Sequence, residues 1–589
     1  MARRDSIMQK PKNARGALRR LLSMLGPFKW MIAGVTVLCL VSNLLSLYGP
    51  TLVGQAMNEV KLGEGRVDLE KVTSIALKML ACYLTSSLLT VAIHTIMVNV
   101  SRRFARSMRQ KVFDKLMTLP VGYFDRHQAG DIISRVNYDI DVISTCMSTD
   151  VVSIVASTVT VVGSLVMMLL LSPLLSLVTL FSVPTAILYT SRMRKKTQPR
   201  YRKRSKCYGE MNGFVEEMLA GQKTIQSYAY EDCAEARFDQ VNTNAAEAYW
   251  DADRLGVTIG PTMGFINNTS LSLIALFGSV LLILQSIDLG KISSFVLYSR
   301  KFSGPINEIA NIVNELFSAL AAAERVFGLL DEEEEPADAP KAVALTDVAG
   351  NVSLEHVAFG YDPGVPIIHD LSLQADAGKL IAIVGPTGAG KTTIINLLMR
   401  FYDVDSGRIA VDGTDIREAT RRSLRSAYAM VLQDTWLFRG TIFDNIAYGR
   451  PEATMDEVVA AAKAAHIHAF IMRLPDGYQT EISEDGGNIS KGQKQLLTIA
   501  RAMLYNARML ILDEATSNVD VGTERRIQRA MRDLMRDKTC FVIAHRLSTI
   551  QNADRILVVN QGDVVEQGTH ETLMAQKGFY HKLYAAQFE

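Results

Sequence analysis

The sequence predicts two domains of different fold class, an all-α domain of membrane-spanning helices followed by a soluble α/β domain. Apolar residues make up 48% of the 589-residue chain, and long charge-poor runs of them lie before residue 320. Residues 351–589 instead resemble a soluble protein that mixes strands and helices. Between them, residues 331–350 are acidic and then rich in Pro and Ala, which is typical of a solvated linker. We therefore expect a membrane domain over 1–330, a linker over 331–350 and a soluble domain over 351–589.

Composition excludes several classes of protein. A net charge of +2 gives no indication of nucleic-acid binding. The six cysteines form no Cys-x-x-Cys pair, and three of them fall inside apolar runs, so neither a disulfide framework nor a zinc site is expected. The first apolar run is too long for the core of a signal peptide.

Six apolar stretches are long enough to cross a bilayer, which requires about 20 mostly apolar residues in a helix. One run, 151–191, is about twice that length and contains Ser172-Pro173 at its middle, which predicts two helices joined by a tight turn. The expected spans are 30–50, 79–101, 142–170, 174–191, 256–285 and 289–311.

Loop charges predict the orientation of these spans. The segments 102–111 and 192–206 are strongly basic, whereas the alternate loops, 59–78 and 286–291, mix both signs. Because basic loops stay in the cytoplasm, both termini are expected there, in a multi-pass protein of the plasma (inner) membrane.

Arg300 and Lys301 lie inside the last expected span. A charge at membrane depth is costly and usually faces a water-filled cavity or a polar partner. The pair is therefore predicted either to line a substrate pathway or to contact helix ends and carboxylates such as Glu308, and the sequence favours neither. His94 and Asp150 are expected to be hydrogen-bonded polar residues between helices.

A phosphate-binding loop follows the strand-like run 380–384. Residues 385–392 read Gly-Pro-Thr-Gly-Ala-Gly-Lys-Thr, and a helical run over 394–400 comes next. This is the GxxxxGK[ST] pattern in its required strand–loop–helix context, where glycines let backbone amides approach phosphate oxygens. Lys391 is expected to reach the β- and γ-phosphates of ATP, and the Thr392 hydroxyl to bind Mg²⁺. The candidate ATP-binding residues here are Gly385, Thr387, Gly388, Ala389, Gly390, Lys391, Thr392 and Thr393.

A second buried strand, 509–512, ends in Asp513-Glu514. Four apolar residues suit a parallel strand that is covered on both faces. Asp513 would then bind Mg²⁺ through water, and Glu514 would orient or deprotonate the attacking water. The alternative is an acidic helix start; beside the phosphate loop it becomes the weaker interpretation.

The order of motifs over 351–589 resembles the nucleotide-binding domain of ABC transporters. That resemblance implies an α/β P-loop NTPase fold with an antiparallel β subdomain and a helical subdomain. It implies that Tyr361 stacks on adenine, that Gln433 contacts Mg²⁺ and that His545 contacts the γ-phosphate as a catalytic residue beside Glu514. Further matches are the signature motif Ser490, Lys491, Gly492 and Gln493, which acts on the partner's ATP, and the D-loop residues Ser517 and Asp520.

The membrane half is similar to ABC exporters as well. Phe124-Asp125, 130–135 and Asp139 resemble the first intracellular coupling region, and 216–221 with Tyr228 resembles the second, which docks on the partner's ATPase domain in that family. A membrane domain followed by an ATPase domain in one chain is the exporter arrangement.

The family clamps ATP between the phosphate loop of one domain and the signature motif of another. This chain carries one set of motifs, so a second half-transporter is expected as a partner. Lys491 stands where the family usually has glycine, while Tyr361, Lys391, Glu514 and His545 match the family. That combination resembles the catalytically intact half of a heterodimeric exporter, whose partner has a normal signature but lacks the glutamate equivalent to Glu514. The alternative is a symmetric homodimer.

Three functions compete on the sequence alone. An exporter of a hydrophobic or amphipathic drug-like compound, lipid or peptide is implied by the resemblance. An importer of a small chelate on the same scaffold is the second. The third is an ATP-gated channel or regulator, and Glu514 argues against it because gating by binding alone would not require fast hydrolysis.

Overall fold

The computed structural model describes residues 13–59, 67–432, 435–483, 488–513, 520–544 and 547–588. They form two compact units. The first consists of Met1–Leu119 and His127–Glu334, and the second of Pro120–Arg126 and Glu335–Glu589. The short segment Pro120–Arg126 therefore belongs to the second unit, although the chain on both sides of it belongs to the first.

In its described residues the first unit is built of helices joined by short turns and loops. Its α-helices are α1 (Ala14–Met24), α2 (Lys29–Asn58), α3 (Leu69–Thr118), α5 (Ala129–Ser134), α6 (Ile140–Thr145), α7 (Val151–Leu171), α8 (Pro173–Ala220), α9 (Gln222–Ser227), α10 (Glu231–Gly256), α11 (Ile259–Ile283) and α12 (Leu289–Leu330). Two π-helical turns, η3 (Arg135–Asp139) and η4 (Cys146–Asp150), connect α5, α6 and α7.

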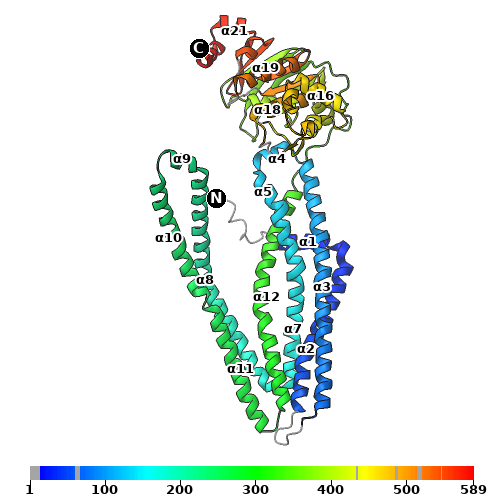
Figure 1. Cartoon of the computed structure of the whole chain (residues 1–589), viewed down its shortest axis with the longest axis vertical. Coiled ribbons are helices and arrows are strands. Elements are labelled where there is room, and N and C mark those ends of the chain that lie inside the picture. The colour runs from blue at the N-terminus through cyan, green and yellow to red at the C-terminus, as the bar shows by residue number, and fades with distance from the viewer. Residues whose placement is uncertain are drawn as a thin grey trace. The chain divides into compact units, whose positions relative to one another are not determined.

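Two groups of helices make up this unit. In one, α2, α3, α7 and α12 pack along one another; in the other, α8 packs against α10 and α11 (Figure 1). The 50 residues of α3 correspond to a length of about 75 Å at 1.5 Å per residue, far more than a bilayer core. The helices therefore extend well beyond the apolar stretches that predict them.

Five helical stretches in the described residues are long and apolar enough to cross a membrane: Gly26–Asn58, Leu69–Thr118, Ala129–Leu171, Pro173–Ala220 and Glu231–Ile283. The sixth long helix, α12, carries the charges of Arg300 and Lys301 and packs against α2 and α7. The predicted break at Ser172-Pro173 is confirmed, since α7 ends at Leu171 and the Ser172 hydroxyl accepts the Leu175 amide at the start of α8.

The described residues of the second unit form three sheets. A six-stranded sheet has the order β12-β11-β3-β10-β9-β6, a four-stranded antiparallel sheet has the order β2-β1-β4-β5, and β7 pairs with β8. The strands are β1 (Val352–Phe359), β2 (Ile368–Ala375), β3 (Leu380–Val384), β4 (Ser406–Val411), β5 (Thr414–Asp415), β6 (Tyr428–Val431), β7 (Gly440–Thr441), β8 (Glu481–Ile482), β9 (Met509–Asp513), β10 (Thr539–Ile543), β11 (Arg555–Asn560) and β12 (Asp563–Gly568).

The α-helices of the second unit mostly lie between these strands. They are α4 (Val121–Arg126), α13 (Lys391–Leu398), α14 (Arg421–Ala427), α15 (Ile442–Ile446), α16 (Met455–Ala464), α17 (His468–Ile471), α18 (Lys491–Tyr505), α19 (Val521–Met535), α20 (Leu547–Gln551), α21 (His570–Gln576) and α22 (Phe579–Phe588). In the six-stranded sheet only β12 pairs antiparallel among the described strands; β6, β9, β10, β3 and β11 form parallel pairs.

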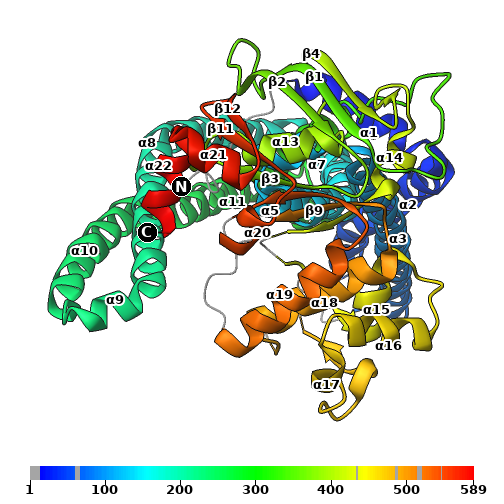
Figure 2. The ribbon, with the colours of Figure 1, turned by 90° about the horizontal axis from the view of Figure 1, so that it is seen from above.

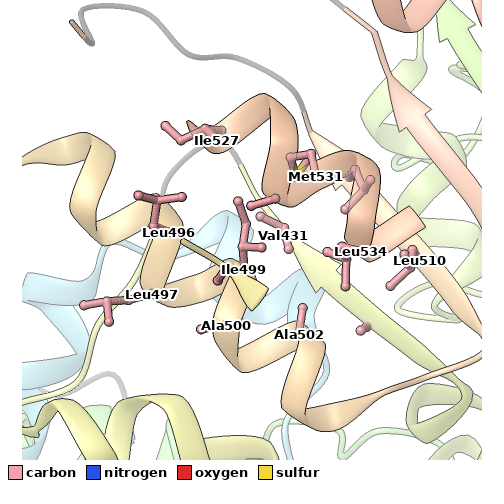
Figure 3. Packing of buried hydrophobic residues seen from close by; sticks show 14 of the residues in the cluster. Val431, Leu496, Leu497, Ile499, Ala500, Ala502, Leu510, Ile527, Met531 and Leu534 are labelled. Carbon is pink, nitrogen blue, oxygen red and sulfur yellow. The ribbon is translucent and has the colours of Figure 1, made fainter. Parts of the chain in front are cut away.

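Both faces of the parallel sheet are covered, which explains why its strands are almost wholly apolar. Ile381 and Ile383 of β3 pack with α13 and the antiparallel sheet, and α13 lies between the two sheets (Figure 2). Ala382 and Val384 point to the opposite face, where α18 and α19 pack. Figure 3 shows Leu496 and Ile499 of α18 beside Ile527 and Met531 of α19 on that face.

The segment 331–350, predicted as a linker, is mostly exposed, but from Glu335 onward it belongs to the second unit. Arg421 of α14 donates to the Asp338 carboxylate at 3.4 Å, and Arg425 pairs with Glu335. Val343 exchanges backbone hydrogen bonds with Glu418 and Thr420. The acidic composition of this segment is therefore matched by basic side chains on α14.

Candidate nucleotide-binding site

The phosphate loop joins β3 to α13 through backbone conformations that favour glycine. Gly388 and Gly390 have φ values of 82° and 102°, in the left-handed region, and Gly390 is the N-cap of α13. At Gly385 a Cβ atom would lie 2.1 Å from the Val559 carbonyl oxygen, so a side chain does not fit there. The loop thus presents the amino end of α13, where free N–H groups and the helix dipole attract anions.

Lys391 lies within this loop. Its Nζ donates to the carbonyl oxygens of Gly385 at 2.7 Å and Pro386 at 2.9 Å. Burial lowers the pKa of Lys391, while the negative charge of Asp513 acts in the opposite direction. The ammonium group therefore lies among the loop carbonyls, close enough to Asp513 for the two charges to interact.

The sheet order brings the loop and Asp513 to one edge. Strand β10 lies between β3 and β9, all three run parallel, and Asp513 is paired with Ile543 at their carboxyl ends. Ligands of open α/β sheets bind at this edge. Thr387 and Thr392 are exposed there, and Ala389 is buried.

Four of the predicted site residues fall outside the residues that the structure describes. They are Gln433, Glu514, Ser517 and His545.

Tyr361 lies just beyond β1, in a group of three aromatic rings that we name the ring cluster: Phe359, Tyr361 and Tyr402. The Tyr361 ring meets Phe359 edge-on at 5.0 Å and Tyr402 at 4.9 Å between centroids. Such edge-to-face pairs are favourable because the positive ring edge meets the negative face.

The Tyr361 hydroxyl connects the ring cluster to α13. It donates to the Thr393 hydroxyl at 3.3 Å and accepts from the Asn396 amide at 3.1 Å. Thr393 is buried, and in this structure its hydroxyl contacts Tyr361, the tyrosine that the resemblance assigns to adenine. The sequence interpretation missed Phe359, Asn396 and Tyr402; an aromatic pair at 401–402, just after α13, was the available signal.

The signature segment forms the start of α18. Ser490 is its N-cap, with a capping box in which the Ser490 amide donates to the Gln493 side chain at 2.9 Å and the Gln493 amide donates back at 3.4 Å. Lys491 is exposed at the first helical position and Gly492 is buried. The helix therefore presents a serine-capped amino end with a lysine beside it.

Asp520 is the N-cap of α19. Its carboxylate accepts the Thr523 amide at 2.9 Å, and this hydrogen bond lowers the pKa of Asp520. This contact explains why α19 starts at this point. The role of Asp520 in the D-loop stays a prediction.

In the first unit, Lys301 of α12 contacts α2. Its Nζ donates to the Ser46 carbonyl at 2.9 Å and to the Ser46 hydroxyl at 2.7 Å. Arg300 is exposed. Asp150 is buried and accepts the Thr149 hydroxyl at 2.8 Å, whereas His94 is exposed.

Two family models match the chain. The ABC transporter transmembrane region matches residues 31–306, and the ABC transporter domain matches residues 368–517. The chain is 46% identical to a fatty acid ABC transporter ATP-binding/permease protein of Mycobacterium bovis over 88% of this chain and 82% of that protein. It is also 41% identical to an uncharacterised ABC transporter ATP-binding protein of Bacillus subtilis, over 98% and 96% of the two chains.

More distant relatives cover nearly the whole chain. An ATP-dependent lipid A-core flippase of Syntrophus aciditrophicus is 31% identical over 98% of this chain and 97% of that protein. The solved structure of a bacterial Atm1-family ABC exporter with ATP bound has a TM-score of 0.75 at 30% identity, over 95% of this chain and 98% of that one. The chain therefore belongs to the ABC transporter family, as an exporter-type half-transporter in which a multi-pass membrane domain is fused to an ATPase domain.

Proposed function

We propose that this chain is the catalytically intact half of a heterodimeric exporter that moves an amphipathic, lipid-like molecule out of the cytoplasm. The observation that carries the pairing is Lys491 at the serine-capped start of α18, in the same domain as a complete phosphate loop. A lysine there adds bulk and charge where a partner's phosphate would approach, but it does not touch this chain's own loop motif. Under this assignment the membrane domain spans 1–330, the linker 331–350 and the nucleotide-binding domain 351–589.

The proposed ATP site combines three groups of this chain. The backbone amides of 385–390 and of the start of α13 would donate hydrogen bonds to the phosphate oxygens, and Lys391 would exchange its loop carbonyls for phosphate oxygens. The ring of Tyr361 stacks on adenine. Glu514 is proposed to orient or deprotonate the attacking water, and His545 to contact the γ-phosphate. Gln433 is proposed to contact Mg²⁺.

Mg²⁺ suits the residues at this edge. Thr392 offers an exposed hydroxyl, and the Asp513 carboxylate lies within electrostatic range of Lys391. Both are hard oxygen ligands of the kind that Mg²⁺ prefers, and Asp513 would act through water. When bound, the ion would neutralise charge on the phosphates.

The partner is proposed to be a different half-transporter with a normal signature and no catalytic glutamate. Ser490, Lys491, Gly492 and Gln493 would then face the partner's slow site, and the partner's signature would complete the site at Lys391. Ser517 and Asp520 would lie at the boundary of the two domains. ATP binding closes this dimer and hydrolysis releases it, which drives alternating access.

We further propose that the chain spans the plasma (inner) membrane six times, with both termini in the cytoplasm. The mixed charge of α12 suits a helix that faces other helices and an aqueous cavity rather than lipid alone. Of the two cations proposed for the pathway, we assign contact with cargo to the exposed Arg300 and contact with α2 to Lys301. The names of two relatives, a fatty acid transporter and a lipid A-core flippase, support a lipid-like cargo.

Replacing Glu514 by Gln tests the catalytic assignment. We expect ATP binding to persist while turnover by the reconstituted complex falls at least a hundredfold, as is typical when an essential general base is lost. Unaltered turnover would show that Glu514 is not the catalytic carboxylate.

The pairing is tested by purifying this chain alone and together with candidate partners. We expect the chain alone to hydrolyse ATP slowly and the correct partner to raise turnover at least tenfold. A stable homodimer with full activity would overturn the heterodimer, while leaving the ATP site itself intact.

A further inference from the structure

The short helix α4 contacts two of the three residues of the ring cluster. The Tyr402 hydroxyl donates to Oδ2 of Asp125 at 2.5 Å, and Nη2 of Arg126 donates to the Tyr361 carbonyl at 3.1 Å. Arg126 also lies 3.9 Å from the Asp362 carboxylate. These contacts are internal to the second unit, because Pro120–Arg126 is part of it.

The fit between α4 and Tyr402 is close. A Cβ atom at Gly122 would lie 3.0 Å from Cε1 and 3.1 Å from the hydroxyl oxygen of Tyr402. Burial, and after it the Asp125 carboxylate, raises the pKa of Tyr402, so the hydroxyl keeps its proton and remains a donor. Tyr402 therefore cannot change orientation without losing its acceptor.

Tyr361 is restrained from three directions. Its hydroxyl bonds to Thr393 and Asn396 of α13, and its ring edges meet Phe359 and Tyr402. Its backbone carbonyl accepts from Arg126. A ring that receives a stacked base binds more tightly when its orientation is fixed beforehand, because less conformational entropy is lost on binding.

We propose that Asp125 and Arg126 are positioning residues for ATP, which fix the orientation of Tyr361 through Tyr402 and through its own backbone. The inference rests on the proposed stacking role of Tyr361. It adds that α4 sets the affinity of this chain's site for the base end of the nucleotide.

The test uses the full-length complex in lipid nanodiscs. ATP affinity is measured by competition with a fluorescent ATP analogue, and kcat and KM are measured for ATP hydrolysis. Tyr402→Phe removes one hydroxyl and keeps the ring. We expect ATP to bind about threefold to tenfold more weakly, the range for one lost hydrogen bond, with KM rising in proportion and kcat at saturating ATP changing less than about twofold.

Matched variants separate this contact from general damage. Tyr448→Phe makes the same chemical change on an exposed tyrosine whose ring stacks on Phe438, and we expect no shift in ATP affinity. Asp125→Ala should weaken ATP binding as much as Tyr402→Phe, and the double variant should be no worse than either. Asp125→Asn keeps an acceptor and should restore most of the affinity. Arg126→Ala should weaken ATP binding, and Arg126→Lys should recover part of it.

Tyr361→Ala distinguishes the two ways of failing. If it leaves ATP affinity unaltered, the stacking role of Tyr361 is wrong and the positioning role falls with it. If it weakens binding while Tyr402→Phe, Asp125→Ala and Arg126→Ala do not, the stacking role stands and the positioning role is overturned. A fall in kcat at constant KM in those variants also overturns the inference, because α4 would then act after binding.

Discussion

Asp412, in the turn between β4 and β5, is a single carboxylate that joins the end of the linker to the sheet. It accepts the amides of Ala349 and Asn351 at 2.8 Å each, the Gly350 amide at 3.2 Å and the Asn351 side chain at 3.0 Å. Burial by itself would raise the pKa of Asp412, but these hydrogen bonds outweigh burial and lower it.

Replacing Asp412 by Ala is expected to destabilise the second unit by about 2 kcal/mol, because charge-assisted hydrogen bonds to three backbone amides are lost and the amide of the buried Gly350 is left unpaired. A depressed pKa contributes stability above the unfolded value near 3.8, and that contribution disappears as pH falls through the folded value. The difference in melting temperature between wild type and Asp412→Ala, measured by scanning fluorimetry, should therefore be full at pH 7 and shrink below about pH 4. Asp376→Ala, at an exposed aspartate nearby, is the control; an equal loss there would contradict the assignment.

Individual residues differ in how well the sequence predicts their position. The phosphate loop was predictable because its function depends on one short run of residues. As expected, the loop lies between a strand and a helix, and Gly390 and Lys391 lie at the start of that helix, α13. The helix itself begins three residues before the expected run and ends two before its end. The contact between Asp125 and Tyr402 was not predictable in this way, because 277 positions separate the two residues.

At the scale of elements, the contact of α12 with α2 centres on Pro50. A proline has no N–H, so the Ser46 carbonyl four residues earlier lacks its helical donor. Lys301 donates to that carbonyl, and Tyr298 donates to the next one, on Leu47, at 2.5 Å. Ser294 adds a hydrogen bond to the Pro50 carbonyl at 2.8 Å. The three donors lie on one face of α12 because they are spaced four and three residues apart.

This arrangement predicts that the effects of Lys301 and Pro50 depend on each other. Lys301→Met should destabilise the complex by about 1–3 kcal/mol because it leaves the partly buried Ser46 carbonyl unpaired. In a Pro50→Ala background the helix supplies the missing N–H, so the same substitution should cost less. Thermal stability of all four proteins in nanodiscs measures the coupling. Equal losses in both backgrounds would show that Lys301 acts elsewhere.

The sequence left two alternatives for Lys301, a place in a substrate pathway or a contact with helix ends and carboxylates such as Glu308. It did not indicate the contact with Ser46 of α2. Helix positions follow from apolar runs and from the Ser172-Pro173 break, which are local properties. The two helices α2 and α12 lie about 250 residues apart in the chain, and their packing decides which turn of α2 meets α12. That register cannot be inferred from one sequence by local patterns. The same reason applies to α14, whose arginines bind the acidic linker although each segment alone reads as a solvated charge run.

For the whole molecule, the proposed asymmetry of the two ATP sites predicts the effect of restoring the usual signature. Lys491→Gly changes only the surface that faces the partner's slow site, so ATP turnover by the complex should change less than about twofold. In a symmetric homodimer the same substitution would act on every active site and raise turnover severalfold. Steady-state ATPase activity of the purified complex distinguishes the two, and a severalfold rise would favour the homodimer.

The docking of the acidic linker and of α4 bears on how the ATPase half can be isolated. A fragment that starts at residue 351 would lack Glu335 and Asp338. Arg421, whose side chain is 8% exposed, would then keep only Asp403 of its three acidic partners. It would also lack Asp125, so Tyr402 would present an uncovered hydroxyl. A soluble fragment of the ATPase half is expected to aggregate less when it begins at Glu335. Its affinity for nucleotide should lie closer to that of the full-length protein when a peptide with the sequence of residues 120–126 is added.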